Sequence, residues 1–260
     1  MFACLIYMIL MFTARAVQAQ EIVTALSESV ISITTSFRGT QLSVFGAIPS
    51  CARGRANPEP DVVVIIRGPA KSVMVRRKER VAGIWVNRHG VRFDGVPSFY
   101  ALAGTRALEE IAPEHVLVTH GIGYKALAFQ PGPSERGAGA SSAPEIAEYR
   151  LAVLRRREAQ GLFRQKEQAL DLFGQVLFRA KFDLPATVAP GIYQAEVYLF
   201  QNGRLISHQI SPLYIDQYGV ERFLHSIAHR RPLLYGLMAV ILALSAGLGI
   251  ASLFRNPIGH

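Results

Sequence analysis

The chain has 260 residues, half of them apolar and 18% charged, and its 28 basic and 19 acidic residues give a net charge of +9. This apolar content excludes global disorder, because it supplies ample surface for a hydrophobic core. The two cysteines, Cys4 and Cys51, exclude a fold held together by several disulfides. The length predicts one or two domains.

The N-terminus has the pattern of a secretory signal peptide. Residues 2–12 are apolar, and small residues follow at Ala14, Ala16 and Ala19. Eleven helical residues extend only about 16 Å, which is too short for a hydrocarbon core of about 30 Å. We therefore expect a signal peptide at residues 1–19, cleaved after Ala19. An uncleaved anchor and a segment without targeting function are the alternatives.

Residues 20–218 contain many short segments with strand character, which predicts a mainly β domain. Asn202-Gly203 suits a type I′ hairpin turn between two of these segments. Strands at such spacing predict an immunoglobulin-like β-sandwich with one or two added helices. We expect strands at residues 30–34, 41–45, 62–66, 72–75, 81–86, 91–93, 116–119, 176–182, 192–200 and 205–215.

Two helices and two long loops are expected within this domain. Residues 98–111 begin with Ser98 as a plausible N-cap and carry apolar residues at helical spacing. Residues 144–170 resemble an amphipathic helix, which Gly161 could interrupt. The intervening residues 130–143 and the earlier residues 47–61 predict mobile loops, the former being rich in Pro, Gly, Ser and Ala.

The C-terminus predicts a membrane span. Residues 233–254 contain 22 positions without a charge, and such a helix is about 33 Å long, enough to cross a bilayer. Residues 219–232 predict a short interfacial helix before it, and residues 255–260 a cytoplasmic tail. With a signal peptide, this arrangement predicts a single-pass protein of the bacterial inner membrane with most of its chain in the periplasm.

One feature of the C-terminal flank conflicts with this topology. The positive-inside rule favours Arg-rich flanks on the cytoplasmic side, whereas Arg222, Arg230 and Arg231 would lie outside. We give the signal peptide more weight, because exported domains translocate largely regardless of their charge.

The densest charge cluster is a basic run. Arg76, Lys78 and Arg80 would share one face of a strand, and together with Arg77 they could bind an anion or lipid headgroups. A solvated hairpin turn is the other interpretation. Nucleic acid is not an expected partner, because the chain is exported and carries no phosphate-binding loop, zinc spacing or RNA-binding motif.

No motif for catalysis or cofactor binding is present. His225 and His229 have the i, i+4 spacing that suits a metal on a helix, but no third ligand is evident, so interfacial polar residues are the favoured interpretation. We therefore expect no enzyme activity, catalytic residue, metal site or cofactor.

His115 and His120 would lie on opposite faces of a strand. A deep polar pocket that gathers His89, His115 or His120 would favour an enzyme, and a flat surface would favour contact with a partner protein. Trp85, the only tryptophan, could line a ligand cleft, but a buried strand position is the commoner explanation.

Five stretches resemble the alphaproteobacterial putative transmembrane protein family. They are residues 76–87, 96–101, 177–180, 182–185 and 231–237. The resemblance implies a signal peptide, an exported β-rich domain and one C-terminal transmembrane helix, without an agreed activity or catalytic residues. It also suggests a loose association with an anion permease of the sulfite-exporter type.

These observations favour a non-enzymatic accessory protein. We expect contact with the lipid bilayer through the C-terminal helix and with an integral-membrane partner, which could be a transporter. The first alternative is a periplasmic domain that binds an anion or another small ligand through Arg76, Arg77, Lys78 and Arg80. A membrane-anchored enzyme of unknown chemistry is the second.

Overall fold

The computed structural model describes residues 22–34, 37–49, 60–127, 129–132, 143–174, 176–217 and 232–253. The chain divides into two units. The first unit comprises residues 1–31 and 38–215 and contains the β-sheets and the helices that connect their strands. The second unit comprises residues 32–37 and 216–260 and contains the C-terminal helix. The predicted signal peptide, interfacial helix and tail lie outside the described residues.

Strands dominate the first unit, which confirms the expected mainly β class. The strands are β1 (Val23–Leu26), β2 (Val30–Ile33), β3 (Thr40–Ala47), β4 (Asp61–Arg67), β5 (Ala70–Val81), β6 (Ile84–Pro97), β7 (Tyr100–Gly104), β8 (Gln130–Pro131), β9 (Phe163–Lys166), β10 (Leu170–Phe173), β11 (Leu177–Leu184), β12 (Gly191–Gln201) and β13 (Arg204–Gln217). The helical elements are α2 (Leu108–Ile111), α3 (Glu114–Thr119), the 3₁₀ turn η2 (Tyr124–Ala126), α4 (Ala143–Ala159) and α6 (Pro232–Leu253).

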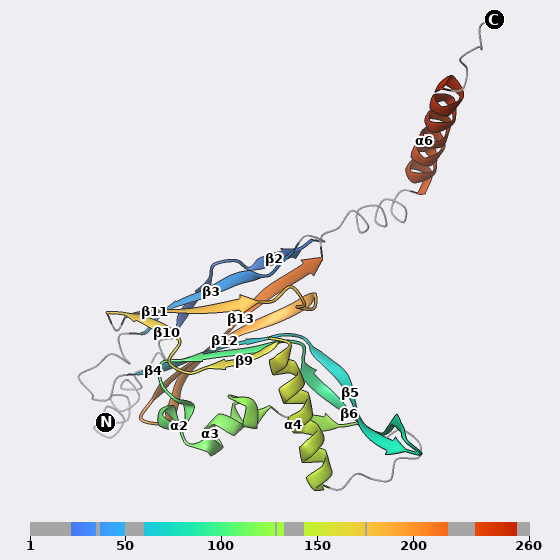
Figure 1. Cartoon of the computed structure of the whole chain (residues 1–260). Helices are drawn as coiled ribbons and strands as arrows, with labels where there is room; N and C mark the ends of the chain where they lie inside the picture. The colour runs from blue at the N-terminus through green and yellow to red at the C-terminus, as the bar shows by residue number, and fades with distance from the viewer. Residues whose placement is uncertain are drawn as a thin grey trace, which may run out of the picture. The chain divides into compact units, whose positions relative to one another are not determined.

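The strands form three sheets. A six-stranded sheet has the order β2-β13-β12-β4-β7-β9, a four-stranded sheet the order β1-β3-β11-β10, and a three-stranded sheet the order β5-β6-β8. Figure 1 shows β3 and β11 over one face of the six-stranded sheet, with α2, α3 and α4 on its other face. Because both faces are covered, the centre of β4 is buried at every position from Val62 to Ile66.

The immunoglobulin-like form of the sandwich is not established by this topology. Immunoglobulin sheets are antiparallel, whereas β7 and β9 pair in parallel at the edge of the six-stranded sheet. The hairpin predicted at Asn202-Gly203 is confirmed, because both residues have positive φ and join β12 to β13.

Both predicted helices of the domain are wrong over part of their length. Residues 100–104 form β7, which is buried throughout between β4 and β9, and only residues 108–111 are helical. The second predicted helix ends at Ala159, and the chain turns at Gly161 with a φ of +68° before it enters β9 and β10. In both segments the apolar spacing fits a helix, but pairing with a neighbouring strand determines the backbone.

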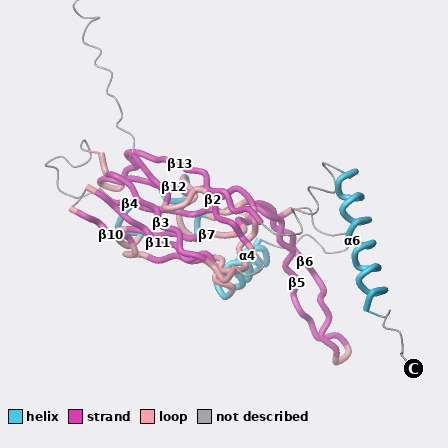
Figure 2. The backbone as a smooth tube through the Cα atoms, turned by 90° about the horizontal axis from the view of Figure 1, so that it is seen from above, coloured by secondary structure: helices cyan, strands magenta, loops and turns pink. Residues whose placement is uncertain are grey.

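Two of the predicted strands also differ. Residues 116–119 lie in α3, which follows Pro113 at its N-cap position, because a short apolar run is compatible with either structure. Residues 81–86 are not one strand: Ala82 and Gly83 form the turn between β5 and β6. These strands extend as a long arm away from the other sheets (Figure 2).

The second unit contains α6, a helix of 22 residues without a charged side chain. Its side chains are described at residues 236–238 and 240–251. Within the described part of the chain, no helix combines the length and the apolar character that a membrane span requires. The transmembrane helix expected at residues 233–254 is therefore not confirmed by the structure.

Candidate functional site

A groove of about 630 Å³ lies on the helical face of the six-stranded sheet, between the α2-to-η2 segment and α4. Its apolar lining includes Leu108, Leu117, Ile122, Leu151 and Leu154. Charged residues of both signs also line it: Glu109, Glu114, Glu158 and Glu167, with Lys125, Arg150 and Arg155. An apolar interior beside mixed charges suits an amphipathic ligand or peptide segment.

A partly buried ion pair lies in the sheet beneath one wall of this groove. Arg67 ends β4, and Glu196 lies on the adjacent strand β12, two register positions along. The Arg67 guanidinium donates from Nε to Glu196 at 2.9 Å and from a terminal nitrogen to the second carboxylate oxygen at 3.2 Å. The side chains are 25% and 6% exposed. Such two-point contacts fix orientation as well as charge.

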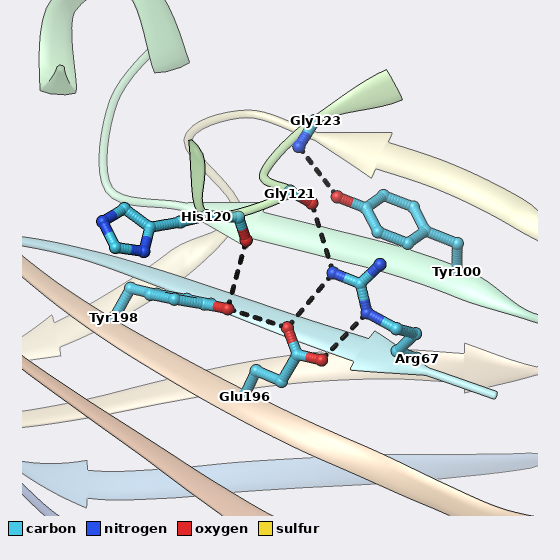
Figure 3. A network of polar contacts seen from close by, with 7 residues as sticks. All are labelled: Arg67, Tyr100, His120, Gly121, Gly123, Glu196 and Tyr198. Atoms are coloured by element: carbon cyan, nitrogen blue, oxygen red, sulfur yellow. Dashed lines mark hydrogen bonds and ion pairs between the residues drawn. The ribbon is translucent and has the colours of Figure 1, made fainter. Parts of the chain in front are cut away.

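The ion pair is part of a network that holds residues 120–123. Arg67 donates to the Gly121 carbonyl at 3.2 Å, and Tyr100 Oη accepts from the Gly123 amide at 2.8 Å. Tyr198 Oη donates to Glu196 at 2.9 Å and lies 3.4 Å from the His120 carbonyl. Figure 3 shows these contacts converging on one short segment.

This segment forms part of the groove wall. Gly121 and Gly123 have φ values of +68° and +89°, a backbone conformation that side chains disfavour. Ile122 and Gly123 both line the groove. The network therefore fixes the shape of the groove from below.

Burial and neighbouring charges shift the pKa values of three side chains in the network. Burial acts to lower the pKa of Arg67, but the hydrogen bond and the charge of Glu196 outweigh it and raise the pKa above its ordinary value. Burial raises the pKa of Tyr100 and of Tyr198, and Glu196 adds to both shifts. These pKa shifts keep both phenols neutral and the Arg67 guanidinium charged at physiological pH.

Aromatic rings connect the network to the groove. Tyr100, Tyr124 and Phe163 form a cluster with ring centroids 6.0–6.2 Å apart. Tyr124 also lines the groove, and its hydroxyl oxygen is inaccessible to solvent without a hydrogen-bond partner within the described structure. Burial raises the pKa of Tyr124 to about 12, and Glu158 acts in the same direction.

Helix α4 supplies the opposite wall. Val153 is buried, and Arg150 donates to the Phe129 carbonyl at 2.9 Å. Leu151 lines the groove and is 50% exposed. The helix therefore presents an apolar residue that the described structure leaves half uncovered.

The chain matches the family described as putative transmembrane protein (Alph_Pro_TM) over residues 21–256. The chain belongs to this family. The resemblance found in five sequence stretches is thereby confirmed. No curated protein and no solved structure matches the chain.

In this member of the family, the predicted anion-binding residues lie away from the groove. Arg76, Arg77, Lys78 and Arg80 lie on β5 and are all exposed, and none of them lines the groove. Arg77 forms an exposed ion pair with Glu148 on α4, at 3.5 Å. The structure brings the four residues onto one strand, and the register of the β5–β6 hairpin shifts between Arg76 and Lys78.

The histidines and the tryptophan also differ from expectation. His115 lies in α3 and His120 follows it, so the two are not on a strand, and neither lines the groove. Within the described ranges, no group of three or more His, Cys, Asp or Glu residues could hold a metal ion. Trp85, expected to be buried, is 67% exposed because it lies next to the turn of the β5–β6 hairpin.

Sequence reasoning missed the Arg67–Glu196 network. The two residues are 129 positions apart, so no local spacing relates them. A weak signal was present, because an arginine ends an apolar strand and a glutamate interrupts another. Only the pairing of β4 with β12 shows that these two charges neutralise each other.

Proposed function

We propose that the protein is a single-pass inner-membrane protein whose periplasmic domain acts as a non-enzymatic accessory module for an integral-membrane partner. The observation that carries the membrane part is the uncharged C-terminal segment in a chain that belongs to a family described as transmembrane. Residues 233–254, counted over their whole length, are sufficient for a bilayer of about 30 Å. The signal peptide predicted at residues 1–19 supports export of the domain.

The groove supports the interaction part of this proposal. Its proposed occupant is an amphipathic segment of the partner. Apolar side chains of this segment would pack against Leu151 and Leu154, and its charged side chains of both signs would pair with the charged residues that line the groove. The lining contains acidic and basic groups together, so charge complementarity favours a segment with mixed charges. Neither His115 nor His120 lines it, which favours contact over chemistry.

Photo-crosslinking in intact membranes tests this function. A photoreactive residue at Leu151 should form a discrete adduct with an integral-membrane protein, with a yield about ten times that of the same residue at Ile206 on β13. The two positions are 50% and 48% exposed. The adduct should be lost in Leu154→Arg, which places a charge in the groove.

Two results would contradict the proposal. One is equal adduct formation from Leu151 and Ile206, which would indicate random contact. The other is an adduct from Leu151 that persists in Leu154→Arg or involves a protein removed from the membrane by alkaline washing. A permease as the partner would be identified by the mass of the adduct.

The second candidate is binding of a small anion by Arg76, Arg77, Lys78 and Arg80. Their clustering on one strand favours an anionic contact, but their exposure favours an extended anionic surface over a small enclosed ion. Addition of inorganic phosphate alone to the protein in detergent, with Trp85 emission as the readout, separates these two possibilities.

A further inference from the structure

The β5–β6 hairpin ends in an apolar tip. Val81, Ile84, Trp85 and Val86 surround the turn at Ala82-Gly83 and are 42%, 69%, 67% and 42% exposed. Such a group of large apolar side chains at the end of a projecting arm is unfavourable in water. A purely structural hairpin turn gives no reason for tryptophan and isoleucine here.

The tip has two different faces. Residues directly opposite each other in an antiparallel pair share a face. Val81 pairs with Ile84, and Glu79 with Val86, so one face carries three apolar residues and one acid. Arg80 pairs with Trp85, and Lys78 with Asn87, so the other face combines the indole with two cations.

Charges on an exposed strand also protect it from pairing with other chains. That role accounts for Arg76, Lys78 and Arg80, since they lie on β5, an edge strand of the sheet β5-β6-β8. It does not account for the exposed Ile84 and Trp85, because apolar tips promote association. The tip therefore needs an occupant that accepts both apolar and cationic groups.

We propose that the hairpin tip inserts into the surface of an anionic lipid bilayer. Tryptophan is enriched at the level of lipid headgroups, where its ring is amphipathic. Arginine and lysine are attracted to anionic lipids, by roughly a factor of five per charge near the surface. Ile84, Val81 and Val86 supply apolar area for the boundary between headgroups and acyl chains.

This inference rests on the proposed membrane tether and deepens it. A tether raises the effective concentration of the membrane for the domain, so that a weak second contact becomes populated. The tip would then limit the orientations of the domain that are available to a partner.

The experiment uses the single tryptophan of the full chain as its probe. The protein is reconstituted into vesicles of phosphatidylcholine alone or of phosphatidylcholine and phosphatidylglycerol in equal parts. In the anionic vesicles, Trp85 emission should shift to shorter wavelength and be quenched by lipids with brominated acyl chains. In the neutral vesicles it should resemble an indole in water, and added salt should weaken the difference.

Charge reversal tests the role of the cations. The double variant Lys78→Glu with Arg80→Glu should reduce the quenched fraction in anionic vesicles about tenfold or more. The control carries the same change of charge at Lys166→Glu and Lys181→Glu, two exposed lysines on β9 and β11 that belong neither to the hairpin nor to the groove lining. The control should behave as the unaltered chain.

Three results would overturn the inference. Trp85 could keep the emission of a water-exposed indole in anionic vesicles, shift equally in neutral ones, or shift in detergent when inorganic phosphate alone is added. An alkaline wash of the same vesicles reports on the tether separately. If the protein stays in the vesicles but Trp85 remains exposed, the tip contact fails and the tether does not.

Discussion

At the scale of single residues, the pair of Arg67 and Glu196 joins two neighbouring strands of the domain by a two-point ion pair. Removing two charges from water is costly, and their mutual attraction and hydrogen bonds offset that cost only while both are present. Glu196 has the lower exposure of the two, with 6% of its side chain accessible. Loss of its charge would leave a largely buried guanidinium without a counter-ion.

We predict that Glu196→Gln lowers the free energy of unfolding by about 3 kcal/mol, because it leaves the Arg67 charge uncompensated. Circular dichroism during thermal and chemical unfolding of the full chain in detergent measures this. Asp183→Asn is the control, since its ion pair with Arg164 is exposed and should change stability by less than about 1 kcal/mol. Adding Arg67→Met to Glu196→Gln should recover part of the loss, and equal effects of the Glu196 and Asp183 changes would refute the argument.

At the scale of elements, β3 and β11 approach closely at Gly46. A Cβ atom at this position would lie 2.2 Å from Cζ of Phe178 and 3.0 Å from the carbonyl oxygen of Val23. The Phe178 ring is buried, so it cannot move aside without displacing its neighbours. Gly46 is therefore required by the packing of the four-stranded sheet.

We predict that Gly46→Ala destabilises the domain by about 1–3 kcal/mol through this overlap. Ser43→Ala also introduces an alanine on β3, but without a predicted overlap, and it should have little effect on stability. Phe178→Leu removes ring atoms from the overlap, so the double variant with Gly46→Ala should lose less stability than the sum of the single changes. Additive losses in the same unfolding measurements would argue against a direct clash.

At the scale of the whole molecule, the proposed tether gives a prediction that is independent of the groove. Leu242→Arg with Leu244→Arg places two charges in the middle of α6, and each costs about 3 kcal/mol at the centre of a membrane-spanning helix. The variant should be released from membranes by alkaline carbonate, whereas the unaltered chain should be retained. Arginines at Ile206 and Ile210, both half exposed on β13, provide the control, which should also be retained. Release of the unaltered chain would refute the tether.

The amino-acid sequence by itself determined the features that depend on neighbouring residues. The unbroken apolar run at residues 62–66 predicted a strand, which β4 provides, and Asn202-Gly203 predicted the hairpin between β12 and β13. The uncharged C-terminal segment predicted a long helix, which α6 provides. Apolar periodicity and turn chemistry act over a few residues, so they can be read without knowledge of the fold.

Only the tertiary structure decided the features that depend on distant residues. Residues 100–104 have apolar spacing that fits a helix, but the hydrogen bonds offered by β4 and β9 on either side make them a strand. The groove and the Arg67–Glu196 pair need β4, β12 and the helices brought together, which no local pattern encodes. The exposure of Trp85 has the same origin, because an apolar residue beside a turn is buried or exposed according to what the rest of the chain places next to it.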